Sequence, residues 1–245
     1  MTPPSADWIV PDWPAPPAVR ALVTTRAGGS SRGPYASFNL DPRVGDDPSA
    51  VERNRETLRS ALPSDPLWLH QVHGAEVVAA ESAPARPRAD GAVARTRHSV
   101  CAVLTADCLP VLLASRTGEA VGIAHAGWRG LAAGVIEATV ARMAVAAAQI
   151  VAWLGPAIGP RAYEVGSDVY DAFIADDAGT APAFTALGGG KHLADLYALA
   201  RRRLAAAGVE AVYGGGFCTH AEEQRFYSYR RDRTTGRFAS LVWME

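Results

Sequence analysis

The chain has 245 residues, of which 49% are hydrophobic and 20% charged, and its formal net charge is −1. This balance gives no electrostatic reason to bind nucleic acid or an anionic membrane, so we expect neither as a partner. No apolar run approaches the roughly 20 residues that a membrane helix needs. The three cysteines form no disulfide framework. The N-terminal stretch lacks the features of a signal peptide, so we expect a cytoplasmic enzyme, and we expect a monomer because no heptad or interface stripe is evident.

The first half of the chain alternates strand-like and helix-like segments around one long loop. Residues 1–18 are rich in proline and should be extended. The other expected elements are, in chain order, a strand at 18–26, a loop at 27–48, a helix at 49–62, paired strands at 67–74 and 76–80, and short strands at 90–95, 99–107, 110–115 and 120–126, with a hairpin turn at 117–119. Asp47 followed by Pro48 is a typical helix start, and the β-branched runs between turn residues predict the strands.

The second half contains longer helical patterns. The predicted elements are helices at 129–148, 166–175 and 193–208 and strands at 150–155, 209–216 and 238–244. Because helices and strands mix without strict βαβ alternation, we expect an α/β (α+β) fold with a mixed sheet. No composition break marks a domain boundary, so residues 1–245 are expected to form a single domain.

Two reactive side chains lie at the ends of successive predicted strands. Cys108 follows Asp107 at a strand end, whereas Cys101 lies inside an apolar run and is expected to be a buried hydrophobe. His125 lies near the end of the strand that follows the hairpin turn. Antiparallel strands joined by such a turn bring their outer ends together. The thiol and the imidazole should therefore meet, either as a Cys–His nucleophile dyad or as two metal ligands.

The segment "LHQVHG" offers a third ligand. Side chains alternate along a strand, so His70 and His73 should point to opposite faces. His70 follows apolar Leu69 and is expected to be structural, whereas His73 lies at the strand end. Three protein ligands with an open fourth position are typical of catalytic zinc. We therefore predict His73, Cys108 and His125 as metal ligands and catalytic residues, with Zn²⁺ as cofactor and copper ranked below it.

The segment "HAGWRG" precedes the predicted helix at 129–148, and free backbone N–H groups at a helix start attract anions. Arg129 could add a forked donor for phosphate. The other residues of interest lie in the long loop, beside His73, and near the C-terminus, where an aromatic ring could stack on a base. The candidate substrate-binding residues are Arg26, Asn39, Arg43, Gln71, Arg129 and Tyr229. The loop residues could equally serve ordinary turn chemistry.

Six segments, in order, resemble the motifs of the YfiH family, also called the laccase-domain or polyphenol-oxidase family. They are "LHQVHG", "ADGAVA", "LTADCLPVLL", "AHAGWRG", "LGPAIGPRAYEVG" and "FCTHAEEQRFYSYRRDRTTGR". The resemblance implies a single layered α/β/α domain and a zinc held by His73, Cys108 and His125. It also implies phosphorolysis of adenosine, inosine, guanosine and methylthioadenosine, together with deamination of adenosine. Purine nucleosides and phosphate would then be the partners.

Three other functions stay open on the sequence. A copper-dependent polyphenol oxidase, laccase-like, would need a multinuclear copper cluster, and six histidines are few for it. A metal-free cysteine hydrolase would use Cys108 and His125, and its activity would survive chelation but not alkylation. A non-catalytic partner-binding protein would show no turnover. For the general acid or base of the nucleoside reactions, Asp107 and Glu164 are weak candidates.

Overall fold

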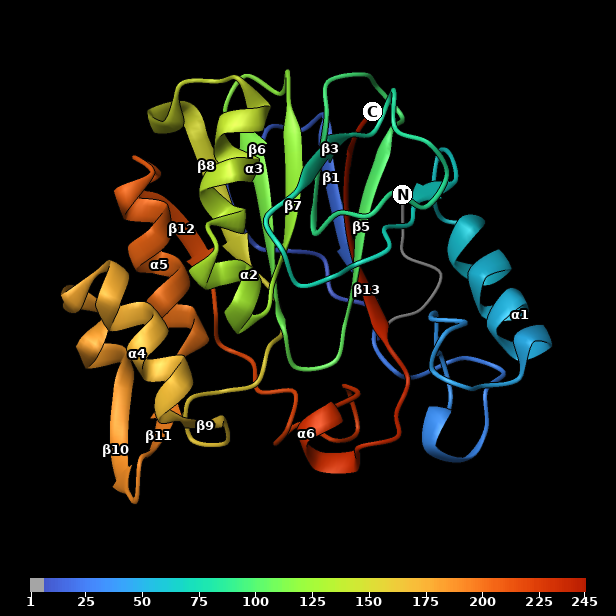
Figure 1. Cartoon of the computed structure of the whole chain (residues 1–245). Coiled ribbons are helices and arrows are strands. Elements are labelled where there is room, and N and C mark those ends of the chain that lie inside the picture. Colours follow the sequence, from blue (N-terminus) through green and yellow to red (C-terminus); the bar gives the residue numbers. More distant parts are fainter. Residues whose placement is uncertain (1–6) are drawn as a thin grey trace.

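Two stacked β-sheets form the centre of the computed structural model, which describes residues 7–245 (Figure 1). The six-stranded sheet has the order β12 (Ala211–Gly214), β8 (Ile150–Leu154), β6 (Leu109–Ser115), β7 (Val121–Ala126), β4 (Gly91–Ala94), β3 (Val77–Ala79). The four-stranded sheet has the order β1 (Val19–Val23), β13 (Phe238–Met244), β5 (Val100–Thr105), β2 (Pro66–Leu67). A small sheet contains β10 (Phe184–Gly188), β11 (Lys191–Ala194) and β9 (Glu164–Gly166).

Helices cover the outer faces of the two large sheets. They are α1 (Pro48–Arg59), α2 (Trp128–Ala132), α3 (Val135–Met143), α4 (Ser167–Asp176) and α5 (Leu196–Ala206). The short helix α6 (Tyr229–Asp232) lies beyond the ends of the strands (Figure 1), and short 3-10 turns occur at Gly33–Tyr35, Ala147–Gln149 and Ala178–Ala183. In Figure 1, α2 to α5 lie on one side of the sheets and α1 on the other. No helix within residues 7–245 is both long enough and apolar enough to span a membrane.

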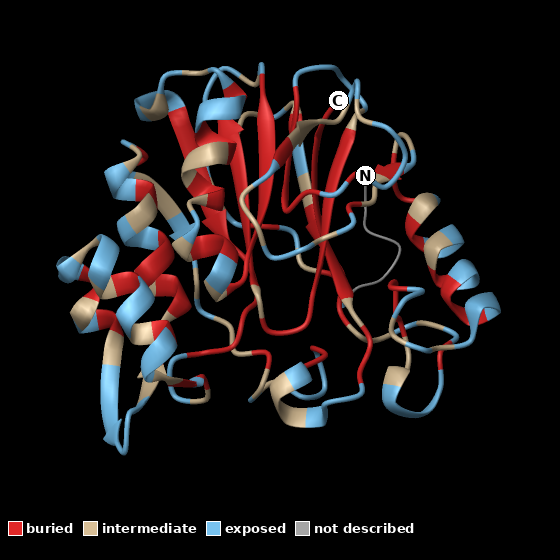
Figure 2. Cartoon of the chain, in the orientation of Figure 1, coloured by how far each residue is buried: buried red, intermediate tan, exposed pale blue. Residues whose placement is uncertain are grey.

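Three apolar clusters hold these layers together. One packs α3 and α5 against the six-stranded sheet, one fills the space between the two sheets, and one packs α1 on the four-stranded sheet. Strands β5, β6 and β7 are buried along their whole length, as the red centre of Figure 2 shows. A strand covered on both faces reads as a continuous apolar run instead of an alternating one, which is the pattern of these segments.

The mixed α/β class predicted from the sequence is confirmed. The β layer is doubled, however, so the layers run helix, sheet, sheet, helix instead of α/β/α. The inner faces of both sheets are apolar and pack against each other, which buries them in one cluster. The strands at 90–95, 99–107, 110–115, 120–126, 150–155 and 238–244, the turn at 117–119 and the helix after Asp47 all form near their predicted positions.

Two predicted elements are wrong. The expected strands at 67–74 and 76–80 do not pair: β2 pairs with β5 and β3 with β4, in different sheets. The expected helix at 129–148 is broken into α2 and α3, because Gly134 adopts a left-handed φ of 87° between them. The strands β9 to β11 were not predicted. Of the extended segment expected at 1–18, residues 1–6 lie outside the described residues, and Ile9 forms a bridge with Val23.

Candidate metal centre

Cys108 and His125 are brought together by the β6–β7 hairpin. The two strands are antiparallel, with Leu109 opposite Ala126 and Pro110 opposite His125. Cys108 immediately precedes β6, so its thiol lies beside the end of β7. The sequence prediction that these strand ends meet is confirmed. The side chain of His125 is 3% exposed, whereas Cys108 is half-buried, so the pair can be reached from one side.

His73 reaches the same place from a turn and not from a strand. Its backbone has a left-handed φ of 61°, which is unusual for a residue with a side chain. The carboxylate of Asp90 accepts hydrogen bonds from the three consecutive backbone N–H groups at 72–74, at 3.1, 2.9 and 2.8 Å. These bonds hold the turn in its strained form and aim the exposed His73 ring at Cys108.

Asp90 also fixes the second histidine. Its Oδ1 lies 2.8 Å from Nδ1 of His125, and its side chain is fully buried. This contact leaves Nε2 of His125 free to bind a metal, in the carboxylate–histidine arrangement common around protein metals. Sequence reasoning did not identify Asp90. The available hint was a carboxylate directly before a buried strand, in "ADGAVA".

The three predicted ligands form one group. One donor atom from each of His73, Cys108 and His125 lies within 4.8 Å of the other two, and Sγ of Cys108 is 3.9 Å from Nε2 of His73. The two imidazole rings meet edge to face with centroids 4.8 Å apart. A thiolate and two imidazoles are a donor set that suits zinc, with a fourth position left for a reactant. The residues present therefore fit a catalytic zinc.

The glycines of "HAGWRG" serve close packing at this site. A Cβ on Gly127 would lie 2.9 Å from Sγ of Cys108 and 3.1 Å from the ring of His73. A Cβ on Gly130 would lie 2.8 Å from the carbonyl oxygen of Gly74. The helix start expected to attract an anion belongs to α2, which has five residues. A helix of five residues has a weak dipole, so this helix start is a weak anion site by itself.

The cluster strongly perturbs its own ionisable groups. Burial by itself would raise the pKa of Cys108, but the charge on His125 and hydrogen bonds to both histidines lower it to about 6. Burial likewise opposes protonation of His125, yet the Cys108 thiolate and the hydrogen bond to Asp90 raise its pKa to about 9. A thiolate is the form of cysteine that binds metals and attacks electrophiles. In contrast, burial raises the pKa of Cys101, as its predicted structural role requires.

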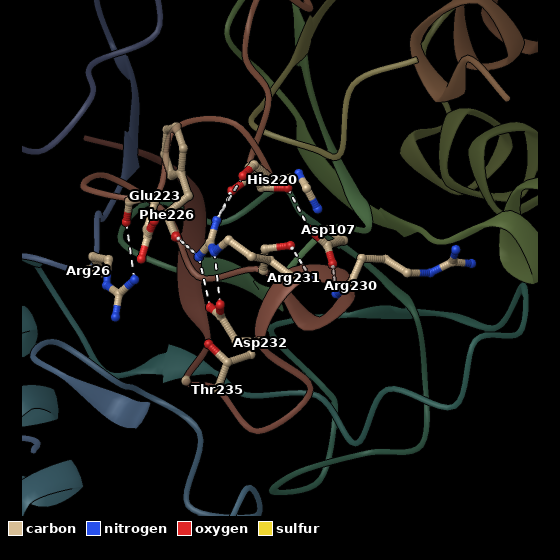
Figure 3. A network of polar contacts seen from close by, with 12 residues as sticks. Arg26, Asp107, His220, Glu223, Phe226, Arg230, Arg231, Asp232 and Thr235 are labelled. Carbon is tan, nitrogen blue, oxygen red and sulfur yellow. Dashed lines mark hydrogen bonds and ion pairs between the residues drawn. The ribbon is translucent and has the colours of Figure 1, made fainter. Parts of the chain in front are cut away.

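Asp107 braces the turn that carries Cys108. It has a positive φ of 98°, and its carboxylate accepts bonds from Oγ1 of Thr219 and the backbone N–H of Arg230, both at 2.7 Å (Figure 3). Its carbonyl accepts a bond from the N–H of Ile158 at 2.9 Å. With both carboxylate oxygens occupied, Asp107 holds the site together and is a poor general base.

Arg231 ties the C-terminal segment to the same region (Figure 3). Its guanidinium donates to the carbonyls of 219 and 220 at 2.8 and 3.1 Å, and to that of Phe226 at 3.1 Å. It also forms a two-point pair with Asp232. Arg231 therefore holds the segment after β12 in one conformation, and the bonds of Thr219 and Arg230 to Asp107 fix that segment beside the Asp107 turn.

Arg26 lies at the start of the long loop and is half-buried. Its Nε donates to the carbonyl of Ala36 at 2.9 Å, and Nη1 donates to that of Glu223 at 3.1 Å. The guanidinium carbon is 4.9 Å from the ring centroid of Tyr227. These contacts join the loop to the C-terminal segment.

Asn39 and Gln71 use their amides within the protein. Asn39 is fully buried; its nitrogen donates to the carbonyl of Asp41, and its oxygen accepts from the N–H groups of Asp41 and Arg237. Gln71 forms two 2.9 Å bonds with the backbone of Leu104, at the end of β5. Gln71 therefore fixes the segment before His73 against β5, and Asn39 joins the long loop to the segment before β13.

The remaining predicted substrate-binding residues are open to solvent. Arg43 forms a two-point ion pair with Asp41, at 2.9 and 3.1 Å. Arg129 is exposed, with its guanidinium 4.3 Å from the ring centroid of Trp128. Tyr229 is 48% exposed and offers a ring face to a ligand. These side chains are free to contact a substrate.

Comparison with known proteins identifies the family. The model of the family described as multi-copper polyphenol oxidoreductase laccase matches residues 20–245. The purine nucleoside phosphorylase PA4543 of Pseudomonas aeruginosa is 55% identical over 97% of this chain and 98% of its own. The purine nucleoside phosphorylase YfiH of Escherichia coli is 54% identical over 96% of this chain and 98% of its own.

Solved structures show the same fold. Protein NMB0706 of Neisseria meningitidis has a TM-score of 0.95 at 52% identity, covering 98% of this chain and 99% of that one. The YfiH protein of Bacillus licheniformis has a TM-score of 0.88 at 30% identity, covering 93% of each chain. On this likeness in sequence and structure, the chain belongs to the YfiH, or multi-copper polyphenol oxidoreductase laccase, family.

Proposed function

We propose that the protein is a zinc-dependent purine nucleoside phosphorylase that also deaminates adenosine. The proposed nucleosides are adenosine, inosine, guanosine and methylthioadenosine, and the proposed compartment is the cytoplasm, with the protein as a monomer. The observation that carries the proposal is the convergence of His73, Cys108 and His125 on one point. It occurs in a chain whose relatives at 44–55% identity are named purine nucleoside phosphorylases.

Zinc suits the site better than copper. A blue-copper centre adds a weak axial ligand, often methionine, to two histidines and a cysteine. Met143 packs beside Gly122, at the opposite end of β7 from His125, and Met244 pairs with Val19 in the other sheet. Among residues 7–245, one group of three or more metal-binding side chains is close enough to share an ion, whereas a laccase needs several. Copper-dependent polyphenol oxidation is the alternative, favoured by the description of the family.

The side chains have separable tasks in the proposed reactions. A bound zinc supplies Lewis acidity at its open position. In phosphorolysis, phosphate attacks C1′ of the ribose, the glycosidic bond breaks, and the purine leaves with the bonding electrons, so negative charge develops on the base. Arg43 and Arg129 bind phosphate, and Tyr229 stacks on the purine. In deamination, water adds to C6 of adenine and ammonia leaves, so no phosphate is consumed.

The residues around the cluster position these groups. Asp90 orients both histidines, and Gln71 holds the turn before His73 against β5. Arg26 and Asn39 hold the long loop against the C-terminal segment. Loss of any of these contacts would shift a metal-binding side chain or a neighbouring loop, but the proposed ligands and phosphate-binding residues would all still be present.

The test combines metal analysis with a nucleoside panel, assayed with and without phosphate. We expect one zinc per chain, release of hypoxanthine from inosine only with phosphate, and conversion of adenosine to inosine without it. Cys108→Ala should lose zinc and both activities. Cys218→Ala is the matched control, because this half-buried thiol accepts a bond from Gly159 and lies outside the cluster.

Two results would replace the proposal. Stoichiometric copper with a blue absorption band and phenol oxidation would support the polyphenol oxidase. Activity that survives metal removal but not alkylation of Cys108 would support a cysteine hydrolase, which the low pKa of this thiol also permits.

A further inference from the structure

Arg237 lies where three parts of the chain meet. It directly precedes β13, whose first residue, Phe238, is opposite Thr105 at the end of β5. In this antiparallel register, Arg237 is beside the 106–108 segment, which ends in the cysteine ligand. Its backbone N–H donates to Oδ1 of Asn39 at 2.9 Å, so the long loop also packs here. The backbone of Arg237 is therefore fixed close to the metal cluster.

The guanidinium of Arg237 has donors to spare. Nη1 donates to the carbonyls of Thr235 and Gly236 at 3.1 and 3.0 Å. Within residues 7–245, neither Nε nor Nη2 has a hydrogen-bond partner, and no carboxylate forms an ion pair with this side chain. The bonds of Nη1 restrict the orientation of the planar group and leave its other edge available.

The charge of Arg237 is also uncompensated. Asp41 is near enough to act on it, but that carboxylate is already engaged at two points by Arg43. Burial lowers the pKa of Arg237, while Asp41, Cys108 and Asp107 oppose the shift. An arginine stays protonated under such conditions. A half-buried cation is less screened than the exposed guanidinium of Arg129 and attracts an anion more strongly.

An aromatic ring lies near this guanidinium. The centroid of the Tyr229 ring lies 5.9 Å from the guanidinium carbon of Arg237 and 6.0 Å from that of Arg233. Tyr229 is the exposed ring to which the proposed function assigns the purine. A cation beside that ring and next to the metal cluster is placed for the other reactant.

We propose that Arg237 binds inorganic phosphate, the attacking anion, through its free Nε and Nη2 groups. The proposal rests on the phosphorylase function proposed above. The fork of two parallel N–H groups matches two oxygens of one phosphate. Arg237 is then a phosphate ligand in addition to Arg43 and Arg129, and the ion pair of Arg43 also occupies Asp41, which would otherwise neutralise Arg237.

The test compares Arg237→Gln and Arg237→Lys with Arg129→Gln and Arg233→Gln in zinc-loaded protein. Loss of a charge-assisted fork should raise the KM for phosphate in inosine cleavage about 10- to 100-fold for Arg237→Gln. Arg237→Lys should recover part of that loss, because it keeps the charge but not the fork. Arg233→Gln removes the exposed cation on the other side of Tyr229 and should change the KM less than about two-fold. Adenosine deamination uses no phosphate, so Arg237→Gln should lower its rate far less than it raises the KM for phosphate.

A direct measurement separates this inference from the proposed function. Calorimetric titration with inorganic phosphate needs no turnover, and Arg237→Gln should weaken binding by the same factor even if no nucleoside is cleaved. Equal phosphate binding by wild type and Arg237→Gln would overturn the inference, as would a loss confined to Arg129→Gln. Thermal unfolding of each variant checks that the fold is intact. If Arg237→Gln unfolds, the Arg237→Lys arm decides, because an unchanged KM for phosphate in that variant would also overturn the inference.

Discussion

Asp90 and His125 are joined twice: the carboxylate accepts from Nδ1 of the imidazole at 2.8 Å, and the backbone N–H of His125 donates to the carbonyl of Asp90 at 2.7 Å. The same carboxylate holds the 72–74 turn that carries His73. One buried acid therefore sets the position of two of the three proposed metal ligands, although it lies outside the proposed ligand set itself.

Asp90→Asn should weaken zinc binding about 10- to 100-fold, which is typical for loss of a carboxylate behind a metal-binding histidine. An amide can accept only at its oxygen and must present its N–H₂ group to donors of the turn. Competition with a coloured chelator would measure the affinity. Asp171→Asn, at an exposed position of α4, is the control and should bind zinc like the wild type. Equal affinities for the two variants would contradict the role of Asp90.

Gly127→Ala tests the space beside the ligands. The added methyl would lie 2.9 Å from Sγ of Cys108, closer than unbonded atoms tolerate, so the thiol or the α2 start must move. We expect zinc affinity to fall at least about 10-fold, since ligand geometry is fixed to within a few tenths of an ångström. Gly216→Ala is the matched control, because its Cβ would meet nothing within 4 Å. Full zinc affinity in Gly127→Ala would show that the backbone yields without cost.

The reactivity of Cys108 should report its lowered pKa. In metal-free protein, the thiolate forms as pH rises through about 6, whereas an ordinary cysteine titrates near about 8.5. The rate of alkylation by iodoacetamide, followed by mass spectrometry, should therefore be half-maximal near pH 6 and level at higher pH. Cys101 should stay unmodified, because it is buried and its pKa is raised. Added zinc should protect Cys108, and a midpoint near 8.5 would refute the assignment.

Asn54 is expected to hold the long loop in place. This buried side chain of α1 donates to Oγ of Ser31 and to the carbonyls of Ser37 and Asn39, and it accepts from the N–H of Ser30. Asn54→Ala leaves buried groups unpaired, so the free energy of unfolding should fall by about 1–3 kcal/mol. Urea unfolding measures this change.

The same substitution should raise the KM for nucleosides, because the loop carries Arg26 and Asn39, while zinc affinity stays constant. Glu56→Ala, on the exposed face of α1, is the control. A loss of zinc in Asn54→Ala would mean that the loop supports the metal ligands as well.

Local pattern was enough to predict much of the fold and the meeting of the Cys108 thiol with two imidazoles. The hairpin at β6 and β7 is encoded by two apolar runs around a turn, and it necessarily brings Cys108 beside His125. His73 lies in the predicted group, but the prediction placed it on a strand, and the structure places it on a left-handed turn. The alanine-rich pattern predicts one continuous helix at 129–148, but Gly134 interrupts it between α2 and α3.

Other features depend on contacts between residues far apart in the chain. The three bonds from the 72–74 turn to Asp90 form instead of the expected strand pairing, and no periodicity in either segment reveals them. Arg237 was not identified either, because its distance from Cys108 is set by the pairing of β13 with β5. The stacking of two sheets follows from the burial of β5, β6 and β7 on both faces, which an apolar run permits but does not specify.

By itself, the sequence determined the mixed α/β class, the strand ends that carry the thiol and the imidazoles, and the resemblance to one family. The tertiary structure decided which carboxylate orients the ligands, which glycines leave room for them and which arginine keeps an unpaired charge beside them. The physical reason is that hydrophobic periodicity acts over a few neighbouring residues, whereas hydrogen-bond partners and charge compensation are settled only when distant segments pack together.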